Sequence, residues 1–271
     1  MENILALARE RRSVRTFDGK EISVYLKEKL ASFMENVDNP YGIRVEFRLL
    51  DPEEHGLTSA VISGAPLYIG AKTARTEHME EAFGYSFEAL VLYAQSLGLG
   101  TTWLGGTMDR KAFEKAMELR DGEVMPCVSP AGFPAAKMSL RETLMRKGIK
   151  ADKRLPFGEV FFDGSFDIPL TGERAGALKE PLEAVRLAPS AVNKQPWRAV
   201  VSNNLVHFYE KRSRGYVSEA TGDLQRIDVG IALCHFDLTA RELGLSPSLT
   251  VADPGISSED DTQYVATFDI G

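Results

Sequence analysis

The chain has 271 residues, with 32 Lys and Arg against 39 Asp and Glu, so its formal charge is −7, and 44% of its residues are hydrophobic. This composition is typical of a globular protein and excludes extended disorder. Its length allows one large domain or two of about 135 residues each. The acidic balance argues against binding to phosphate backbones, so we expect no nucleic-acid partner.

Neither export nor membrane insertion is predicted. The first residues, MENILALARERRSVRTF, place apolar residues before the arginines, which reverses the order of a secretory signal. The longest apolar runs are far shorter than the roughly 20 residues that a spanning helix needs. Cys127 and Cys234 show no C-x-x-C spacing. We therefore expect two buried free thiols in a cytoplasmic protein with no membrane partner.

The first half of the chain predicts helices that alternate with strands. The first helix opens at Ile4 and runs into the basic residues 11–15, and Ser23 is a candidate cap for the second helix. Alternating residues then predict a strand, and apolar residues at helical spacing predict a long buried helix that stops at Gly98. The second helix, two strands and the long helix are expected over residues 24–37, 43–49, 64–70 and 83–97.

The second half repeats this order. Before it, a surface helix over 135–152 and a strand over 160–162 end the first half. The pattern then restarts, with residues 179–182 matching 27–30 at an offset of 152, and Gly230 matching Gly84 at an offset of 146. Two related modules in tandem, 1–163 and 164–271, explain this order most simply. The alternative is that two amphipathic helices ending in Leu-Gly-Leu agree by chance.

Three polar segments are candidates for chemistry. The first is Arg11-Arg12-Ser13-Val14-Arg15, whose guanidinium groups repel one another unless they are solvated or bind an anion. The second is the loop from Ala188 to Trp197, in which two prolines constrain a run of polar residues suited to the edge of a heteroaromatic ring. Each also has a plain structural explanation, as a solvated face and as a helix-to-strand connection respectively.

The third segment, from Gly98 to Gly106, holds four glycines around Trp103. It closes a helix rather than opening one, and it lacks the last glycine of the G-x-G-x-x-G spacing, so it is not a dinucleotide-binding fingerprint. Its glycines permit the backbone to approach another flat group closely.

Together the three segments resemble the nitroreductase family of flavin mononucleotide (FMN) enzymes. The family hallmarks are an R-R-S-x-R segment, a P-S-x-x-N-x-Q-P-W loop and a long helix ending in G-L-G-x-x-W, and each is present here in nearly the same letters. The resemblance implies an α+β fold, a mostly antiparallel sheet with helices around it, duplicated within one chain.

The order of these hallmarks departs from the family pattern. The first module has the basic segment, the glycine-rich stretch and a basic tail at 153–156, but residues 37–45 replace its P-S loop. The second module has the P-S loop, but residues 167–169 replace its basic segment. The resemblance therefore implies a fused pseudo-dimer, monomeric in solution, in which one complete flavin site survives between the modules.

The resemblance assigns the site residues position by position. Arg11 and Arg154, with Lys153, would bind the phosphate, and Ser13 would bind the ribityl or phosphate oxygens. Arg15 would approach the pyrimidine side of the ring, where its positive charge would stabilise the reduced flavin. The full set of expected cofactor contacts is Arg11, Arg12, Ser13, Arg15, Leu104, Gly105, Gly106, Arg154, Pro189, Ser190, Ala191, Asn193 and Gln195.

The implied function is an FMN-dependent NAD(P)H oxidoreductase that transfers hydride in ping-pong fashion to a nitroaromatic or quinone-type acceptor. This chemistry belongs to the cofactor, and the sequence shows no triad, paired carboxylates or metal spacing among its four histidines. Two alternatives stay open, a flavin-sequestering protein without turnover and a degenerate scaffold without flavin. The choice between NADH and NADPH and the acceptor itself have no recognisable signature.

Overall fold

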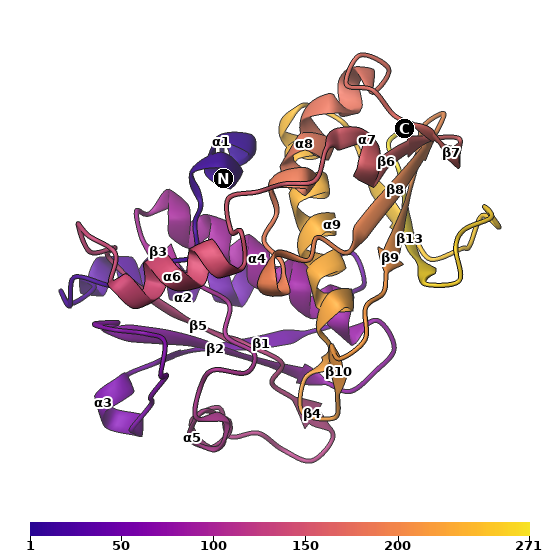
Figure 1. Ribbon diagram of the computed structural model, residues 1–271. Coiled ribbons are helices and arrows are strands. Elements are labelled where there is room, and N and C mark those ends of the chain that lie inside the picture. Colours follow the sequence, from indigo (N-terminus) through magenta and orange to yellow (C-terminus); the bar gives the residue numbers. More distant parts are fainter.

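Two β-sheets flank a pair of crossed helices in the computed structural model, which describes residues 1–271 (Figure 1). The first sheet has the strand order β1-β2-β5-β3, and the short β4 pairs with β2. All of its named strand pairs are antiparallel. Its strands are β1 (Val45–Leu50), β2 (Leu67–Ala74), β3 (Gly100–Thr101), β4 (Glu123–Val124) and β5 (Val128–Gly132).

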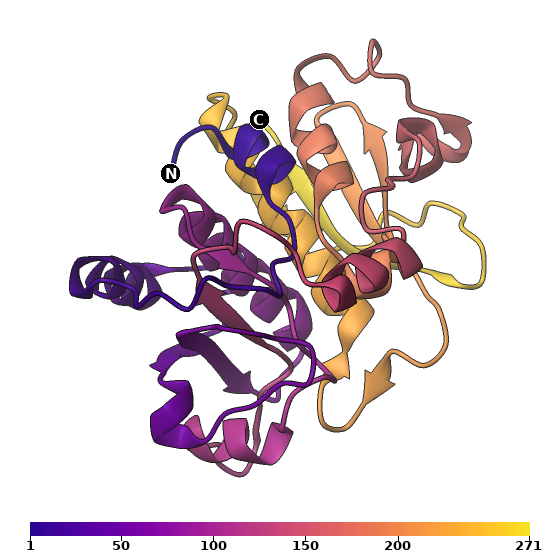
Figure 2. The ribbon, with the colours of Figure 1, turned by 60° about the vertical axis from the view of Figure 1, so that its left-hand side comes forward.

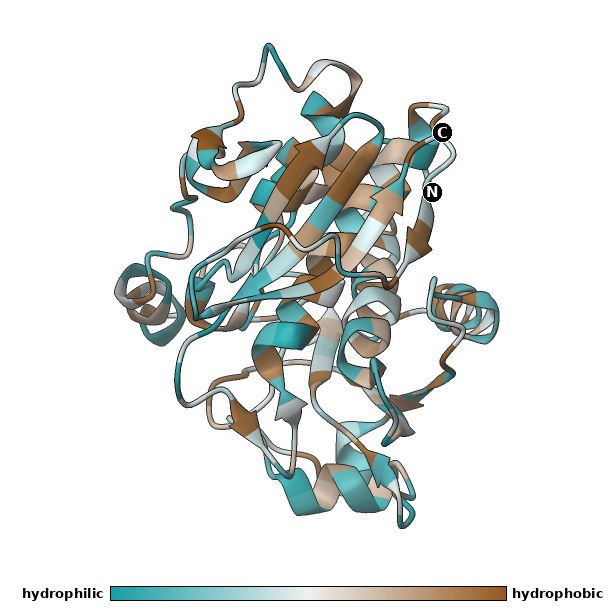
Figure 3. Ribbon diagram, turned by 90° about the vertical axis from the view of Figure 1, so that its right-hand side faces the viewer, coloured by the Kyte–Doolittle hydropathy of each residue, from teal (hydrophilic) through white to brown (hydrophobic).

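The second sheet has the order β12-β13-β9-β8-β6-β7, and a small hairpin, β10-β11, stands apart from it. Only the pair β6 and β8 is parallel. Figure 3 faces this sheet and shows apolar segments along its strands. The strands are β6 (Phe161–Asp163), β7 (Ser165–Pro169), β8 (Trp197–Ser202), β9 (Leu205–Lys211), β10 (Val217–Ser218), β11 (Gly222–Asp223), β12 (Ser248–Thr250) and β13 (Thr262–Asp269).

The helices complete an α+β fold, as predicted. None of them is both long and apolar enough to cross a membrane. They are α1 (Ile4–Glu10), α2 (Val24–Asn36), α3 (Pro52–His55), α4 (Met79–Ser96), α5 (Arg110–Ala116), α6 (Leu140–Gly148), α7 (Phe157–Val160), α8 (Lys179–Leu187) and α9 (Leu224–Glu242), with short 3-10 turns at Gly176–Leu178 and Ala191–Asn193.

The long helices α4 and α9 cross at one glycine from each. A Cβ atom on Gly84 would lie 2.1 Å from the carbonyl oxygen of Ile227, and one on Gly230 would lie 2.3 Å from that of Glu81. Only glycine permits two backbones to approach so closely. These are the two glycines that the 146-residue offset aligns, so equivalent positions meet at the crossing.

Buried polar side chains also join α4 to α9. Tyr85 donates from its hydroxyl to Asp237 Oδ2 at 2.5 Å, and His235 Nε2 lies 2.9 Å from Glu88 Oε1. The His235 and Glu88 side chains are both fully buried. Such polar groups are costly to bury unpaired, so these bonds fix how the two helices meet.

The two halves share one order of elements. The strand order β1-β2-β5-β3 corresponds to β8-β9-β13-β12, and α2 and α4 hold the places that α8 and α9 hold in the second half. One segment crosses between them, because β6, which precedes residue 164, pairs with β8 in the second sheet. Figure 2 shows the chain between α6 and α7 passing from one half toward the other.

The sequence predicted wrong ends for two helices. The first helix ends at Glu10, and residues 11–15 are extended instead, with Ser13 bridging Thr101 in parallel. The surface helix covers only Leu140–Gly148, because Ser139 caps its start. Ser23 is confirmed as the cap of α2, accepting a hydrogen bond from the Leu26 amide at 3.4 Å.

Candidate functional site

The basic segment lies against the glycine-rich stretch that follows α4. The amide of Val14 donates to the Thr101 carbonyl at 2.9 Å, and a Cβ atom on Gly100 would lie 2.6 Å from Val14 Cγ2. Glycine at position 100 thus allows the basic segment to run directly beside β3. Two of the three sequence motifs are therefore adjacent in the fold.

The Pro189–Trp197 motif forms a loop with unusual backbone angles. Val192, Asn193 and Gln195 have φ values of 44°, 59° and 52°, all in the left-handed region. Residues other than glycine rarely adopt this region, and a β-branched residue such as Val192 is strained there by about 1 to 3 kcal/mol. Strain of this kind persists only where surrounding contacts hold it in place.

Polar side chains of the loop supply those contacts. Gln195 Oε1 accepts from the Leu155 amide at 2.9 Å, and Asn193 Nδ2 donates to the carbonyls of Lys150 and Lys153 at 2.8 and 3.0 Å. Ser190 Oγ accepts from the Gln195 amide at 2.8 Å. The Asn193 and Gln195 side chains thus bind the loop to residues 150–155.

Arg154 joins this loop to the arginine cluster. Its guanidinium donates to Asn193 Oδ1 at 3.2 Å and to the Leu187 carbonyl at 3.1 Å. Arg11, in the basic segment, is 8% exposed. Four guanidinium nitrogens here are buried without a hydrogen-bond partner: Arg11 Nε, Arg15 Nε, Arg15 Nη1 and Arg154 Nε. Buried donors of this kind are rare and call for an acceptor, which a phosphate or another anion would provide.

The electrostatics of the cluster agree with this geometry. Burial and then the nearby charge of Arg11 lower the pKa of Arg154 to about 10. Burial also lowers the pKa of Arg11 and of Arg15, although Glu88 and Glu142 respectively act against this shift. The charge of Arg146 on α6 lowers the pKa of all three arginines further. Arg146 pairs with Asp152, so Arg11, Arg15 and Arg154 are the buried charges that a bound anion would stabilise.

Arg12 and the glycine-rich stretch have protein partners of their own, unlike the unpaired arginine nitrogens. Arg12 pairs with Glu142 on α6 at 3.2 Å, and Thr16 donates to the same carboxylate at 2.7 Å. Arg12 therefore anchors α6 and has its own carboxylate partner. Leu104 is buried and bridges Val128, and the Gly105 carbonyl accepts from Arg110 at 2.6 Å. Gly106 is exposed and has no atoms within 4 Å of a Cβ position, so that part of the stretch faces open space.

Two residues at this site were missed by sequence reasoning. Asp228 lies on α9 and is 4% exposed, and both of its oxygens are 3.0 Å from the Ala191 amide of the loop. Burial raises its pKa well above the usual value. An acidic residue directly between the apolar Ile227 and Val229 of the helix was the available signal. Arg146 was hidden within a segment rich in charged residues, for which a surface helix is the ordinary expectation.

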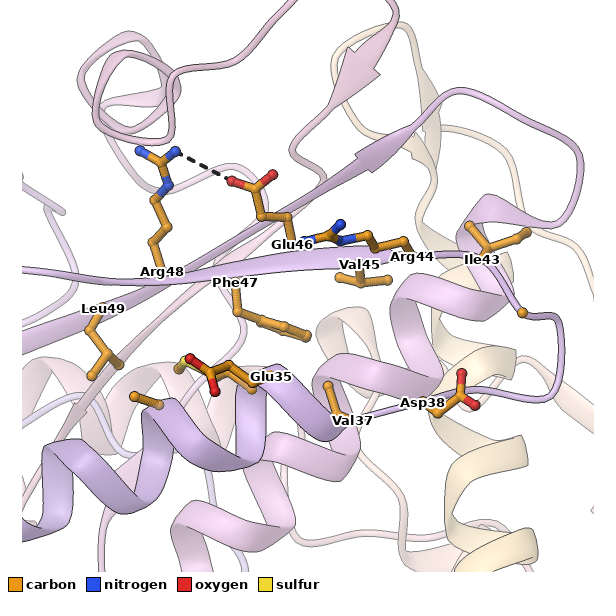
Figure 4. Close-up of a pocket in the computed structure, with 13 residues that line it drawn as sticks. Glu35, Val37, Asp38, Ile43, Arg44, Val45, Glu46, Phe47, Arg48 and Leu49 are labelled. Carbon is orange, nitrogen blue, oxygen red and sulfur yellow. Dashed lines mark hydrogen bonds and ion pairs between the residues drawn. The ribbon is translucent and has the colours of Figure 1, made fainter.

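Other parts of the molecule offer different chemistry. The structure contains no group of three His, Cys, Asp or Glu side chains placed to hold a metal ion. Both cysteines are free and buried, as predicted, and burial raises the pKa of Cys127 to about 12. A cavity of about 550 Å³ lies between α2 and β1, and none of its lining residues belongs to the arginine cluster (Figure 4).

Comparison with known proteins identifies the family. A family model described as "Putative TM nitroreductase" matches residues 3–240. No curated protein matches the chain. A crystal structure of a protein described as a "putative nitroreductase" from Thermotoga maritima is 20% identical, with a TM-score of 0.63, and the match covers 100% of this chain and 94% of that one.

Two further solved structures match about half of the chain. An FMN-dependent nitroreductase from Clostridium difficile is 18% identical with a TM-score of 0.42, over 49% of this chain and 88% of that one. A crystal structure of a protein described as "Putative NADH Oxidase" from Clostridium acetobutylicum is 24% identical with a TM-score of 0.39, over 48% of this chain and 89% of that one. Because the family model covers most of the chain, the chain belongs to the nitroreductase family described as "Putative TM nitroreductase".

Proposed function

We propose that this chain is an FMN-dependent NAD(P)H oxidoreductase with one flavin site between its two halves. The single observation that carries the proposal is the set of four buried guanidinium nitrogens without partners, on Arg11, Arg15 and Arg154. These donors fit a phosphate group, because Arg presents planar donors that match phosphate oxygens. Membership of the nitroreductase family supports FMN as the molecule that carries the phosphate.

The residues have distinct roles in this proposal. Arg11 and Arg154 hold the phosphate, and Ser13 binds the oxygens beside it. The strained loop borders the flavin ring with Pro189, Ser190 and Ala191, while Leu104, Gly105 and Gly106 lie against the other side. Asn193 and Gln195 hold the loop in place through residues 150–155. Sites formed by residues locked through such contacts keep their geometry when a ligand binds.

Bound FMN would supply hydride transfer from NADH or NADPH to a small aromatic or quinone-type acceptor. The protein contributes binding, orientation and a positive charge. Arg15 has two buried nitrogens free to face the pyrimidine edge of the ring, where negative charge increases on reduction. Arg15→Ala should therefore lower the reduction potential of bound FMN, and an unchanged potential in a xanthine oxidase titration would contradict this role.

We also infer that the chain is an internally duplicated pseudo-dimer divided near residue 163. Support comes from the matching strand orders and from the glycines that meet at the helix crossing. In this arrangement the first half supplies Arg11, Arg15 and Arg154, and the second half supplies the loop at 189–195. One flavin per chain is the expected stoichiometry.

Visible absorption tests the proposal directly. The purified protein would be incubated with FMN, desalted and then treated anaerobically with NADH or NADPH. About one equivalent of flavin per chain that bleaches with the nucleotide is the expected result. Flavin that binds without bleaching would favour a sequestering protein, and a protein that retains no flavin would leave the motifs without a cofactor role.

A further inference from the structure

The two sheets differ at one edge. In the second sheet, β8 pairs with β9 on one side and in parallel with β6 on the other. In the first sheet, the equivalent strand β1 pairs only with β2 and forms the edge. Its outer peptide groups have no strand partner. Unpaired edges of this kind are sites where another chain can add a strand.

The groove beside β8 is filled by the chain itself. We call residues 155–163 the arm, which contains α7 and β6. Phe161 of the arm pairs with Ala199 and is fully buried, and Leu155 and Phe157 pack against the core of the second half. The Leu155 carbonyl accepts from Arg186 of α8 at 3.4 Å. The arm thus occupies the space between α8 and β8.

The equivalent groove beside β1 is open. At the 152-residue offset, Phe47 and Leu49 correspond to Ala199 and Val201. A cavity of about 550 Å³ lies here between α2 and β1, and its apolar lining comprises Ala31, Met34, Val37, Ile43, Val45, Phe47 and Leu49. Figure 4 shows Val45 and Phe47 pointing toward α2, while Glu46 and Arg48 point to the other face of β1.

We propose that this α2–β1 groove binds an extended, aromatic segment of a partner polypeptide, which adds to β1 as a parallel strand. The occupant of the equivalent groove defines this chemistry, because the arm places phenylalanines against α8 and β8 and pairs in parallel with β8. Strand addition gives affinity through the main chain, and the apolar lining selects the side chains. The inference does not depend on the flavin site.

The arm itself supplies a probe. A fluorescein-labelled synthetic peptide of residues 155–163, LPFGEVFFD, would be titrated with the full-length protein and followed by fluorescence anisotropy. The control peptide has its three phenylalanines replaced by serine. Hydrogen exchange of residues 44–50 and of residues 197–202 would be measured with and without peptide.

We expect the arm peptide to bind saturably and to slow hydrogen exchange in residues 44–50. In the Met34→Glu variant we expect the peptide to bind at least tenfold more weakly. Met34 is partly exposed on α2, and Phe47→Glu on β1 is a second variant in case the first fails to fold. No saturation up to about 1 mM overturns the proposal. Slower exchange confined to 197–202 overturns it too, because the peptide would then be replacing the chain's own arm. If exchange at 44–50 slows as the protein concentration rises in the absence of peptide, the occupant of the groove is a second copy of this chain, which also overturns the proposal.

Discussion

Two helix-to-strand connections occupy equivalent places but are held by different means. In the first half, Asn39 caps its own connection, accepting from the amides of Tyr41 and Ile43, and Gly42 takes the left-handed turn. In the second half, Val192 and Asn193 take left-handed angles, and the loop is bound to residues 150–155 and to Asp228. The first connection is held mainly by local contacts, whereas the second depends on distant segments.

This difference separates a structural connection from a candidate binding loop. A glycine turn with a local amide cap can be built without strain, and Asn39 makes one further bond to a distant residue, by donating to Ser86 Oγ at 3.1 Å. The loop at 189–195 carries strain and needs Arg154, which belongs to the same cluster as the unpaired arginine nitrogens. The geometry of the loop and the proposed anion site are thus coupled through one side chain, Arg154. The predictions below test this coupling and the relation between the two halves.

The largest expected effect is at the helix crossing. Gly230→Ala would place a methyl group 2.3 Å from the Glu81 carbonyl oxygen and push α4 and α9 apart. We expect the free energy of unfolding to fall by about 3 kcal/mol or more, measured by urea denaturation. Gly148→Ala, where nothing lies within 4 Å, is the control. Equal stability of the two variants would contradict the close crossing.

Arg154→Met tests the link between loop and anion site. Removing a charged donor should weaken FMN binding by about 2 to 3 kcal/mol, or roughly 30- to 150-fold in Kd, measured by flavin fluorescence quenching. Arg141→Met removes an exposed arginine from α6 and should leave the Kd within a factor of about two. Similar losses in both variants would mean that general positive charge, and not Arg154, binds the cofactor.

Asp228→Asn tests how α9 holds the loop. The pKa of Asp228 in the folded protein lies well above 3.8, the usual value for an Asp side chain in an unfolded chain. At pH values between these two pKa values, Asp228 is ionised in the unfolded chain but still protonated in the folded protein. The free energy of unfolding therefore falls as pH rises through this range. Asp228→Asn cannot ionise at this position, so its free energy of unfolding does not fall for this reason. The stability of Asp228→Asn relative to the original protein should therefore be better at pH 8 than at pH 4, as measured by urea denaturation at both pH values. Asp167→Asn, at an exposed position, is the control, and parallel pH profiles for Asp228→Asn and the original protein would refute the prediction.

The smallest expected effects come from exchanging the turn residues. Val192→Gly relieves a left-handed β-branched residue and should raise the free energy of unfolding by about 1 kcal/mol. Gly42→Val places such a residue in the unstrained connection and should lower it by about 1 kcal/mol or more. Urea denaturation measures both changes. A stabilising Gly42→Val would contradict the distinction drawn between the two connections.

The periodicity of the sequence predicted most elements because apolar spacing reports which face is buried. The long helix with Phe83, Phe87 and Leu90 and the strand with Val45 were predictable in this way, and both pack in the core of the first half. Ser23 was predictable as a cap because its hydroxyl acts locally. The family resemblance rested on three short motifs, two of which are in direct contact in the fold.

Other features depended on contacts between distant segments. The left-handed angle of Val192 opposes its own preference and is stable only because residues 150–155 and Asp228 hold the loop. The roles of Arg12 and Arg154 could not be separated by sequence, since both are arginines in basic runs, and only burial and a Glu142 partner distinguish them. Local patterns in the sequence thus determined the elements and the family. The tertiary structure decided the pairing of the arm with β8, the open edge of β1 and the unpaired arginines. Each of these features depends on which distant groups are present to bury or bind the polar groups concerned.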